Sequence, residues 1–161
     1  MSENSVPIIR EFRPGDEAGI CAAHVRSVRD LCAKDYGPEE IEAWIGTRKP
    51  QDYLDAMAKG ERFHVIDMDG TIAGFSGWVG ERILGFYIHP AFAGQGLGRA
   101  LFRATEEDFL HRSGSRLCLI TSTITARGFY QRMRFKMIEA KRHRLRSGRE
   151  IDAFEMRKDY D

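Results

Sequence analysis

One segment of the chain joins an apolar strand pattern to a helix pattern through a glycine-rich loop, and this segment limits the fold more than any other. An apolar run over residues 83–88 ends at His89-Pro90, and apolar residues at helical spacing begin at Leu97. Three glycines lie between and around these patterns, at positions 94, 96 and 98. A strand that turns through glycines directly into a helix predicts a mixed α/β architecture.

The same turn has the chemistry of an anion site. A helix start leaves about four backbone N–H groups without partners and carries the positive end of the helix dipole. Glycines let a ligand approach that backbone closely, as a phosphate would. On the residues alone, a tight strand-to-helix turn explains the glycines equally well. No Gly-Lys-Ser/Thr follows, so the loop is not a P-loop, and the third glycine comes too soon for a dinucleotide fingerprint.

The rest of the chain supplies helices first and strands afterwards. Asp16 is placed to cap a first helix, Pro38 to start a second, and Asp69-Gly70 to close a hairpin. The expected helices cover residues 17–34, 38–45, 50–59, 97–113 and 126–133. The expected strands cover residues 8–12, 63–66, 72–79, 83–88, 117–120, 135–145 and 151–156. The order is that of one mixed α/β (α+β) domain, without the strict alternation of a doubly wound parallel sheet.

Composition excludes several classes of protein. A chain of 161 residues buries one core without disulfides or metals, and a net charge of +1 gives no overall attraction to DNA or membranes. Three cysteines without metal-ligand spacing read as buried residues in a reducing compartment. No apolar run approaches the ~18 residues of a membrane span, and the N-terminus lacks a leader pattern. We therefore expect a cytoplasmic protein that binds no metal.

Two motifs in register resemble one known family. Residues 89–101, His-Pro-x4-Gln-Gly-Leu-Gly-Arg-Ala-Leu, look like the acetyl-CoA signature of the GCN5-related N-acetyltransferases (GNAT). Residues 123–135 are similar to the family's Asn-x-x-Ala-x-x-Phe-Tyr-x-x-x-Gly-Phe. Residues 36–44 and 122–126 resemble a poorly characterised bacterial branch of that family. The resemblance implies one acetyltransferase-like domain over residues 1–161, with a core at 8–157. It also implies a central, mostly antiparallel, twisted sheet of about seven strands flanked by helices.

The resemblance also implies roles for individual residues. Ile88 would hydrogen-bond the pantetheine through its backbone, Thr123 would contact the cofactor, and Tyr130 would be the general acid that protonates the departing thiolate. The pyrophosphate of acetyl-CoA, the co-substrate, would accept hydrogen bonds from the backbone N–H groups of Gly94, Gln95, Gly96, Leu97, Gly98 and Arg99.

Three positions depart from the family pattern. Ala93 stands where Gln or Arg is usual, Thr123 where Asn is usual, and Arg134 where Gly is usual. None of these changes removes an amide from the loop, so the functional interpretation stands. Arg134 would meet its position at some backbone cost.

The general base and the acceptor are less defined. Glu81 is a weak candidate for the base, because relatives often carry a Glu near the start of this strand, although its register is off by one. His24, His89 and His143 could each titrate near neutrality, and ordinary buried or exposed imidazoles explain them as well. The acceptor pocket would draw on His24, Tyr36 and Trp44.

A basic stretch at residues 132–149 holds eight Lys or Arg and one acid. Strand periodicity would put Arg142, Arg144 and Arg146 on one face. That face could simply be solvated, or it could attract the 3′-phosphate of coenzyme A or an acidic acceptor. Nucleic acid is a poor fit, because no aromatic residues interleave with the arginines.

The resulting hypothesis is an enzyme that transfers acetyl from acetyl-CoA to a primary amine, on a small molecule or a peptide, by direct attack in a ternary complex. The alternative is a non-catalytic acyl-CoA-binding sensor or regulatory module on the same fold. A third reading is a binding module for RNA or protein that uses residues 132–149. The sequence leaves a homodimer open.

Overall fold

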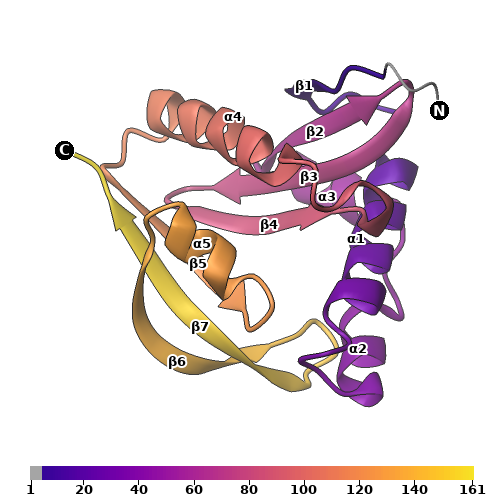
Figure 1. The fold of residues 1–161 in the computed structure, drawn as a ribbon, viewed down its shortest axis with the longest axis vertical. Coiled ribbons are helices and arrows are strands. Elements are labelled where there is room, and N and C mark those ends of the chain that lie inside the picture. The colour runs from indigo at the N-terminus through magenta and orange to yellow at the C-terminus, as the bar shows by residue number, and fades with distance from the viewer. Residues whose placement is uncertain (1–4) are drawn as a thin grey trace.

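The computed structural model describes residues 5–161, and these form one seven-stranded sheet with helices on both faces (Figure 1). The elements in chain order are β1 Ile8–Glu11, α1 Glu17–Leu31, α2 Pro38–Ile45, α3 Gln51–Ala58, β2 Arg62–Met68, β3 Thr71–Val79, β4 Arg82–Ile88, the 3-10 helix η1 Pro90–Phe92, α4 Leu97–Arg112, β5 Leu117–Thr123, α5 Arg127–Arg132, β6 Lys136–Arg144 and β7 Glu150–Asp159. The strand order is β1-β2-β3-β4-β5-β7-β6. The expected mixed α/β fold with a mostly antiparallel sheet is confirmed.

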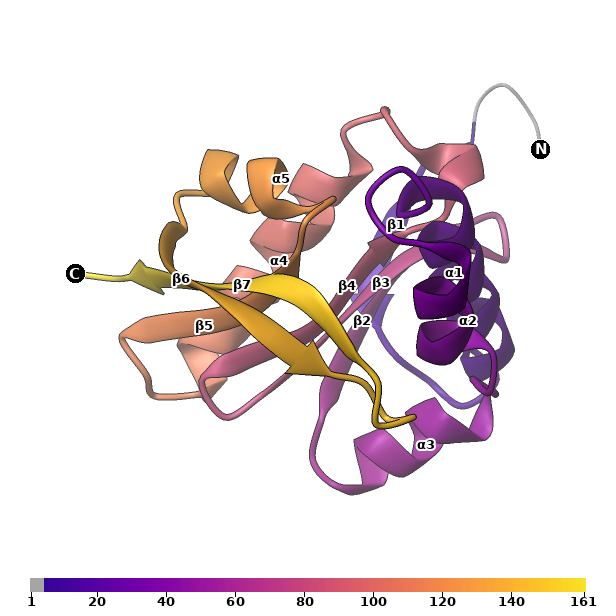
Figure 2. The ribbon, with the colours of Figure 1, turned by 90° about the horizontal axis from the view of Figure 1, so that it is seen from below.

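Helices α1 and α4 cover opposite faces of the sheet at β3, as Figure 2 shows. This placement explains why β3 is buried on both faces from Ile72 to Trp78. On the α1 face, Ile20 and Tyr53 pack against Phe63 and Phe75. On the other face, Phe102 and Phe109 of α4 enter a cluster with residues of β5, α5 and β7. No helix in residues 5–161 has the length and apolar character of a membrane span.

Two local expectations are corrected. Asp16 precedes α1 as predicted, but its side chain does not cap the helix. Its carboxylate instead accepts hydrogen bonds from the Arg10 guanidinium at 2.8 Å and from the backbone N–H of Arg13 at 2.9 Å. Strand β6 ends at Arg144, so Arg146 does not continue the face of Arg142 and Arg144. The cause is the turn at residues 145–149, where the Leu145 N–H already donates to the Arg149 carbonyl.

The sheet divides between β4 and β5. These parallel strands pair only at Arg82–Leu119 and Ile83–Ile120. Strand β4 then remains paired with β3 as far as Ile88, while β5 pairs with β7 as far as Thr123. From Leu84 onward, the edge of β4 that faces β5 has no partner strand. This divergence, which we call the fork, opens the middle of the sheet to a ligand.

Candidate functional site

Two cavities meet at the fork. The smaller, about 210 Å³ and called the groove here, lies between β4, β5, α4 and α5. The larger, about 500 Å³ and called the chamber, lies between α1, α3, β4 and the β6–β7 hairpin. Both are lined by Leu84, Gly85, Tyr87, Thr121 and Thr123. Because they share a wall, molecules in the two cavities would meet at β4.

The glycine-rich loop lies at the entrance to α4 and has the geometry of an anion cradle. Gly94 and Gly96 have φ of 77° and 76°, values that favour glycine. The first helical bond runs from the Ala100 N–H to the Gly96 carbonyl at 3.3 Å. Within the described residues, no backbone N–H from Gly94 to Arg99 donates to another protein group. These amides are therefore available to a ligand at the positive end of a 16-residue helix.

The loop and the groove are continuous. A Cβ placed on Gly98 would lie 3.4 Å from the ring of Phe129 and 3.8 Å from the Ile88 side chain. Ile88, Gly98 and Phe129 all line the groove. A phosphate on the loop and an extended chain in the groove could thus belong to one ligand. The predicted residues Ile88 and Gly94 to Arg99 are brought together here.

Tyr130 is buried beside the same groove. Its ring is 4% exposed and packs edge-on against Phe86, Phe129 and Phe135, with ring centroids 5.4 to 6.2 Å apart. Its residue lines the groove, and its hydroxyl has no hydrogen-bond partner among residues 5–161. Burial raises the pKa of Tyr130 well above its ordinary value. The phenol therefore keeps its proton at neutral pH.

Thr123 is at the fork but already has a bond within the protein. It ends β5 and lines both cavities, as its predicted role requires. Its Oγ1 accepts a hydrogen bond from the Ala126 N–H at 3.0 Å, which supports the turn into α5. Any contact with a ligand would come in addition to this bond.

Glu81 is not brought into the site. It lies exposed in the turn between β3 and β4, and its carboxylate is 3.5 Å from the Ser115 hydroxyl. It lines neither the groove nor the chamber. The turn places it at the closed end of the fork, where β4 and β5 are still paired.

The chamber contains part of the expected acceptor pocket. His24 and Trp44 line it, whereas Tyr36 is buried beside it and binds backbone groups instead. The Nδ1 atom of His24 lies 2.8 Å from the Tyr53 hydroxyl, and burial lowers the pKa of His24 to about 3. His24 is therefore neutral and too weakly basic to serve as the base. Of the three arginines, Arg144 and Arg146 line the chamber and Arg142 does not.

Three residues at the cavities carry no motif and were missed. Arg48 and Glu61 line the chamber, and Cys32 lines the groove. Burial raises the pKa of Glu61 to about 7, against the opposing charge of Arg48. Cys32 was expected to be buried, and it is, but nothing in its spacing indicated a place beside Tyr130. Each of these positions depends on contacts between distant segments.

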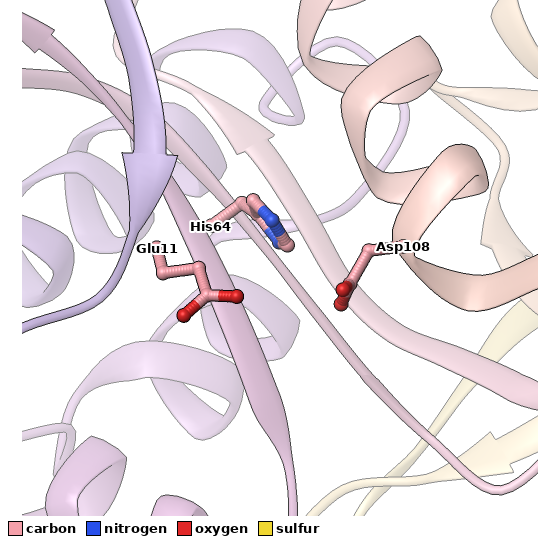
Figure 3. A group of neighbouring side chains, drawn as sticks. All are labelled: Glu11, His64 and Asp108. Atoms are coloured by element: carbon pink, nitrogen blue, oxygen red, sulfur yellow. The ribbon is translucent and has the colours of Figure 1, made fainter. Parts of the chain in front are cut away.

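A second charged cluster lies away from the fork. Glu11, His64 and Asp108 each offer one ligand atom, and these atoms lie within 4.8 Å of one another (Figure 3). The two carboxylates already accept bonds from Arg62, at 2.7 Å for Glu11 and 3.0 Å for Asp108. Arg112 donates to Asp108 at 2.8 Å. A cation would have to displace these guanidinium groups, so we regard the cluster as an ionic contact that joins β1, β2 and α4.

Comparisons with known proteins agree on one family. The Acetyltransferase (GNAT) domain matches residues 32–160. The Uncharacterized N-acetyltransferase YafP of Escherichia coli K12 is 27% identical over 134 residues, which are 83% of this chain and 84% of YafP. A crystal structure from Rhodopseudomonas palustris, described as a GCN5-related N-acetyltransferase and "Aminotransferase, Class-II", has a TM-score of 0.87 and 25% identity over 96% of both chains. The PaiA N-acetyltransferase of Thermoplasma acidophilum, solved in complex with coenzyme A, has a TM-score of 0.72 and 19% identity over 96% of this chain and 99% of its own.

Proposed function

This chain belongs to the GNAT family of acetyltransferases, and from that premise we propose that it transfers acetyl from acetyl-CoA to a primary amine by direct attack in a ternary complex. The single observation that carries the proposal is the phenol of Tyr130. It lines the groove, keeps its proton at neutral pH, and makes no hydrogen bond to another described residue. A group of this kind is suited to protonate a leaving thiolate.

The groove and the loop supply the binding. The free amides of residues 94–99 would hold the pyrophosphate, and the unpaired edge of β4 up to Ile88 would hydrogen-bond the pantetheine arm. The thioester supplies an acetyl group that is already activated toward amines. The amine would come from the chamber and reach the carbonyl carbon across the wall that both cavities share.

The proton transfers follow from this placement. A C–N bond forms as the neutral amine attacks, and the C–S bond then breaks. Tyr130 donates its proton to the departing sulfur, and its phenolate regains one from the nitrogen of the adduct. The product amide and a free thiol result, with one proton released from the original ammonium to a base or to water.

An acyl-enzyme route is disfavoured by the environment of the cysteines. Burial raises the pKa of Cys32, which lines the groove, and raises that of Cys118 to about 12. A thiol that holds its proton is a poor nucleophile. We therefore expect Cys32→Ala to retain turnover and no acetylated cysteine to be detected during the reaction.

Tyr130→Phe tests the role of the phenol. We expect kcat to fall by about 100-fold, within the usual contribution of a general acid, while the Kd for acetyl-CoA changes by less than about threefold, because the ring remains in place. Thiol release and calorimetry measure the two quantities.

Tyr160→Phe is the matched control, because its phenol binds the Glu106 carboxylate away from both cavities. Unchanged turnover in Tyr130→Phe would remove Tyr130 from catalysis. A wild-type protein that binds acetyl-CoA but releases no thiol with polyamines, amino acids, aminoglycosides or peptide N-termini would instead be the non-catalytic acyl-CoA sensor.

A further inference from the structure

Most charges around the chamber are paired with one another. Arg82 and Lys141 share the Glu155 carboxylate, at 2.8 and 3.4 Å. Arg146 pairs with Asp52 at 3.1 Å. These pairs neutralise the walls and need nothing from a ligand.

Three charged groups are left over in the described part of the chain. Arg48, Glu61 and Arg144 line the chamber, and none of them forms an ion pair or a side-chain hydrogen bond with another residue. The Nε of Arg48 is buried without a hydrogen-bond partner. Buried polar groups in proteins are usually hydrogen-bonded, so an orphaned donor at a cavity wall points to a ligand acceptor.

Glu61 is directed toward the fork. A Cβ placed on Gly77 would lie 2.1 Å from the Glu61 Oε2 atom, so the carboxylate rests directly on the backbone of β3. Gly77 pairs with Gly85 of β4, and Gly85 belongs to the wall that both cavities share. The rings of Phe63 and Phe75 lie over these two glycines, so the Glu61 carboxylate and β4 line the chamber on either side of aromatic side chains.

Arg48 supplies the opposite charge within the same chamber. Its guanidinium carbon is 5.9 Å from the centroid of the Tyr53 ring, and its charge is felt at Glu61, whose pKa it lowers against the effect of burial. Yet Arg48 and Glu61 make no direct ion pair with each other. A carboxylate and a guanidinium that face one cavity without neutralising each other are complementary to a zwitterion.

Resting on the proposed acetyl transfer, we propose that the acceptor is a primary amine that also carries a carboxylate, an amino acid in the broad sense. Glu61 binds its ammonium group and takes the proton that must leave before attack. Arg48 binds its carboxylate. Arg144, at the mouth of the chamber, adds a second unpaired positive charge that favours an anionic acceptor over a simple amine.

The proton balance is complete with these groups. The ammonium gives one proton to the Glu61 carboxylate, and the neutral amine attacks the thioester carbon. The adduct nitrogen loses its second proton as Tyr130 protonates the sulfur, so that the phenol is restored. Glu61 then releases its proton to solvent through the open chamber. Burial raises the pKa of Glu61 to about 7, which suits a group that must both accept and release a proton near neutral pH.

Acceptor pairs test the proposal without any variant. Wild-type protein is assayed by thiol release with L-leucine and 3-methylbutylamine, L-phenylalanine and 2-phenylethylamine, and 4-aminobutyrate and propylamine. Each pair differs by the carboxylate. At least one amino acid should exceed its partner by about tenfold or more in kcat/KM, the range expected for one charge-assisted bond.

Variants then assign the two ends of the acceptor. Arg48→Met should bring that ratio close to one. Because the Arg48 charge also lowers the pKa of Glu61, the two members of each pair are compared in the variant at a pH well above neutral. Glu61→Gln should lower kcat/KM for both members by about 10- to 100-fold. It should also remove the rise of rate with pH near neutrality, which the wild type shows as Glu61 loses its proton. The other charged groups facing the chamber are Asp52, Arg82, Lys141, Arg144 and Arg146, and burial lowers the pKa of the two histidines there, His24 and His143. Both variants leave all of these groups in place. Arg149→Met is the matched control, because Arg149 pairs with Glu39 outside the chamber.

The outcomes distinguish the amino-acid acceptor from acetyl transfer itself. Equal rates within every pair would overturn the amino-acid acceptor while leaving acetyl transfer intact. A Glu61→Gln profile that overlays the wild type would overturn the role of Glu61 alone. Failure of the wild type to acetylate any amine, with acetyl-CoA still bound, would overturn this inference together with the proposed function.

Discussion

Arg134 occupies a backbone conformation that costs it free energy. It follows α5 with φ of 74°, in the left-handed region where a side chain on Cα is strained. The family motif usually has glycine at this position, and the positive φ explains why an arginine is strained here. The strained residue belongs to the turn that leads from Tyr130 to Phe135. A hydrogen bond from the Phe135 N–H to the Tyr130 carbonyl, at 2.9 Å, supports this turn.

Arg134→Gly is therefore expected to stabilise the protein. Relief of left-handed strain is worth about 1–2 kcal/mol, and the greater freedom of glycine in the unfolded chain offsets about 0.4–1 kcal/mol of it. We expect the free energy of unfolding to rise by about 0.5–1 kcal/mol, as measured by urea denaturation. Arg134→Ala serves as the control that removes the charge and keeps the strain. A stabilisation in Arg134→Ala equal to that in Arg134→Gly would show that charge, not φ, is responsible.

Single residues differ in how far their sequence context predicts them. Tyr130, Ile88 and Gly98 lie in motifs whose spacing is local, and the structure brings all three to the groove. Glu61 lies between a helix and a strand with no motif, and its burial depends on Gly77, which is distant in the chain. Glu81 lies in the turn between β3 and β4, outside both cavities, and its distance from them likewise depends on the tertiary fold. Whether a charged side chain is buried depends on the tertiary fold and cannot be predicted from the spacing of residues in the sequence.

At the scale of elements, the N-terminus of α4 carries the predicted phosphate site without side-chain help. Gly96 precedes the helix in a left-handed conformation, and a Cβ there would meet nothing within 4 Å. The cost of a side chain at this position is therefore conformational only. A change in φ at Gly96 would tilt the amides of Leu97 and Gly98 away from a common focus.

Gly96→Ala should lower both stability and acetyl-CoA affinity. We expect unfolding to become easier by about 1–2 kcal/mol and the Kd for acetyl-CoA to rise by about tenfold, the equivalent of 1.4 kcal/mol. Gly114→Ala is a matched control at the opposite end of the same helix, with φ of 71° and equally open space. It should lose similar stability and keep its affinity. An equal loss of affinity in both variants would mean that the loop amides do not bind the cofactor.

The basic stretch at residues 132–149 shows what periodicity can and cannot predict about an element. The strand–turn–strand pattern is confirmed, because alternation is a local property of the hairpin. The exposed charges, however, find partners in distant elements. Arg146 binds Asp52 near the start of α3, and Arg149 binds Glu39 in α2. The local excess of positive charge is thus reduced by neighbours that only the tertiary fold supplies.

At the scale of the whole molecule, Tyr36 ties together three regions that are far apart in the chain. Its hydroxyl donates to the Asp152 carbonyl of β7 at 2.6 Å and accepts from the Ile124 N–H at 2.9 Å. The residue itself lies between α1 and α2. Sequence reasoning placed it in the acceptor pocket, and the structure gives it a position behind the chamber wall instead.

Tyr36→Phe should destabilise the fold more than an ordinary loss of a hydroxyl. It leaves a part-buried backbone carbonyl and a part-buried backbone N–H without their partner, which costs up to about 1–3 kcal/mol for each. Thermal or urea denaturation measures the change. Tyr160→Phe, which loses a bond to the partly exposed Glu106, should cost less. A smaller loss in Tyr36→Phe than in Tyr160→Phe would contradict the bridging role.

The overall architecture could be predicted from the sequence, but only part of the candidate site could. The order of helices and strands, the Asp69-Gly70 hairpin and the glycine-rich loop depend on neighbours along the chain, and each is found as expected. The chamber is formed by α1, α3 and the β6–β7 hairpin, which meet only when the sheet is complete. Its unpaired charges, Arg48 and Glu61, could not be predicted before those elements were in place.

The fork also has a consequence for the way the chain folds. Strands β1 to β4 form one set of pairings and β5 to β7 another, and two residue pairs join them across the length of α4. Nearby segments pair sooner than distant ones, because closing a long loop costs more entropy. The β2–β3–β4 meander and the β6–β7 hairpin should therefore each assemble early, whereas the β1–β2, β4–β5 and β5–β7 pairings join strands that lie far apart in the chain and should form later. The proposed opening for the substrates thus lies beside one of the late-forming pairings of the sheet.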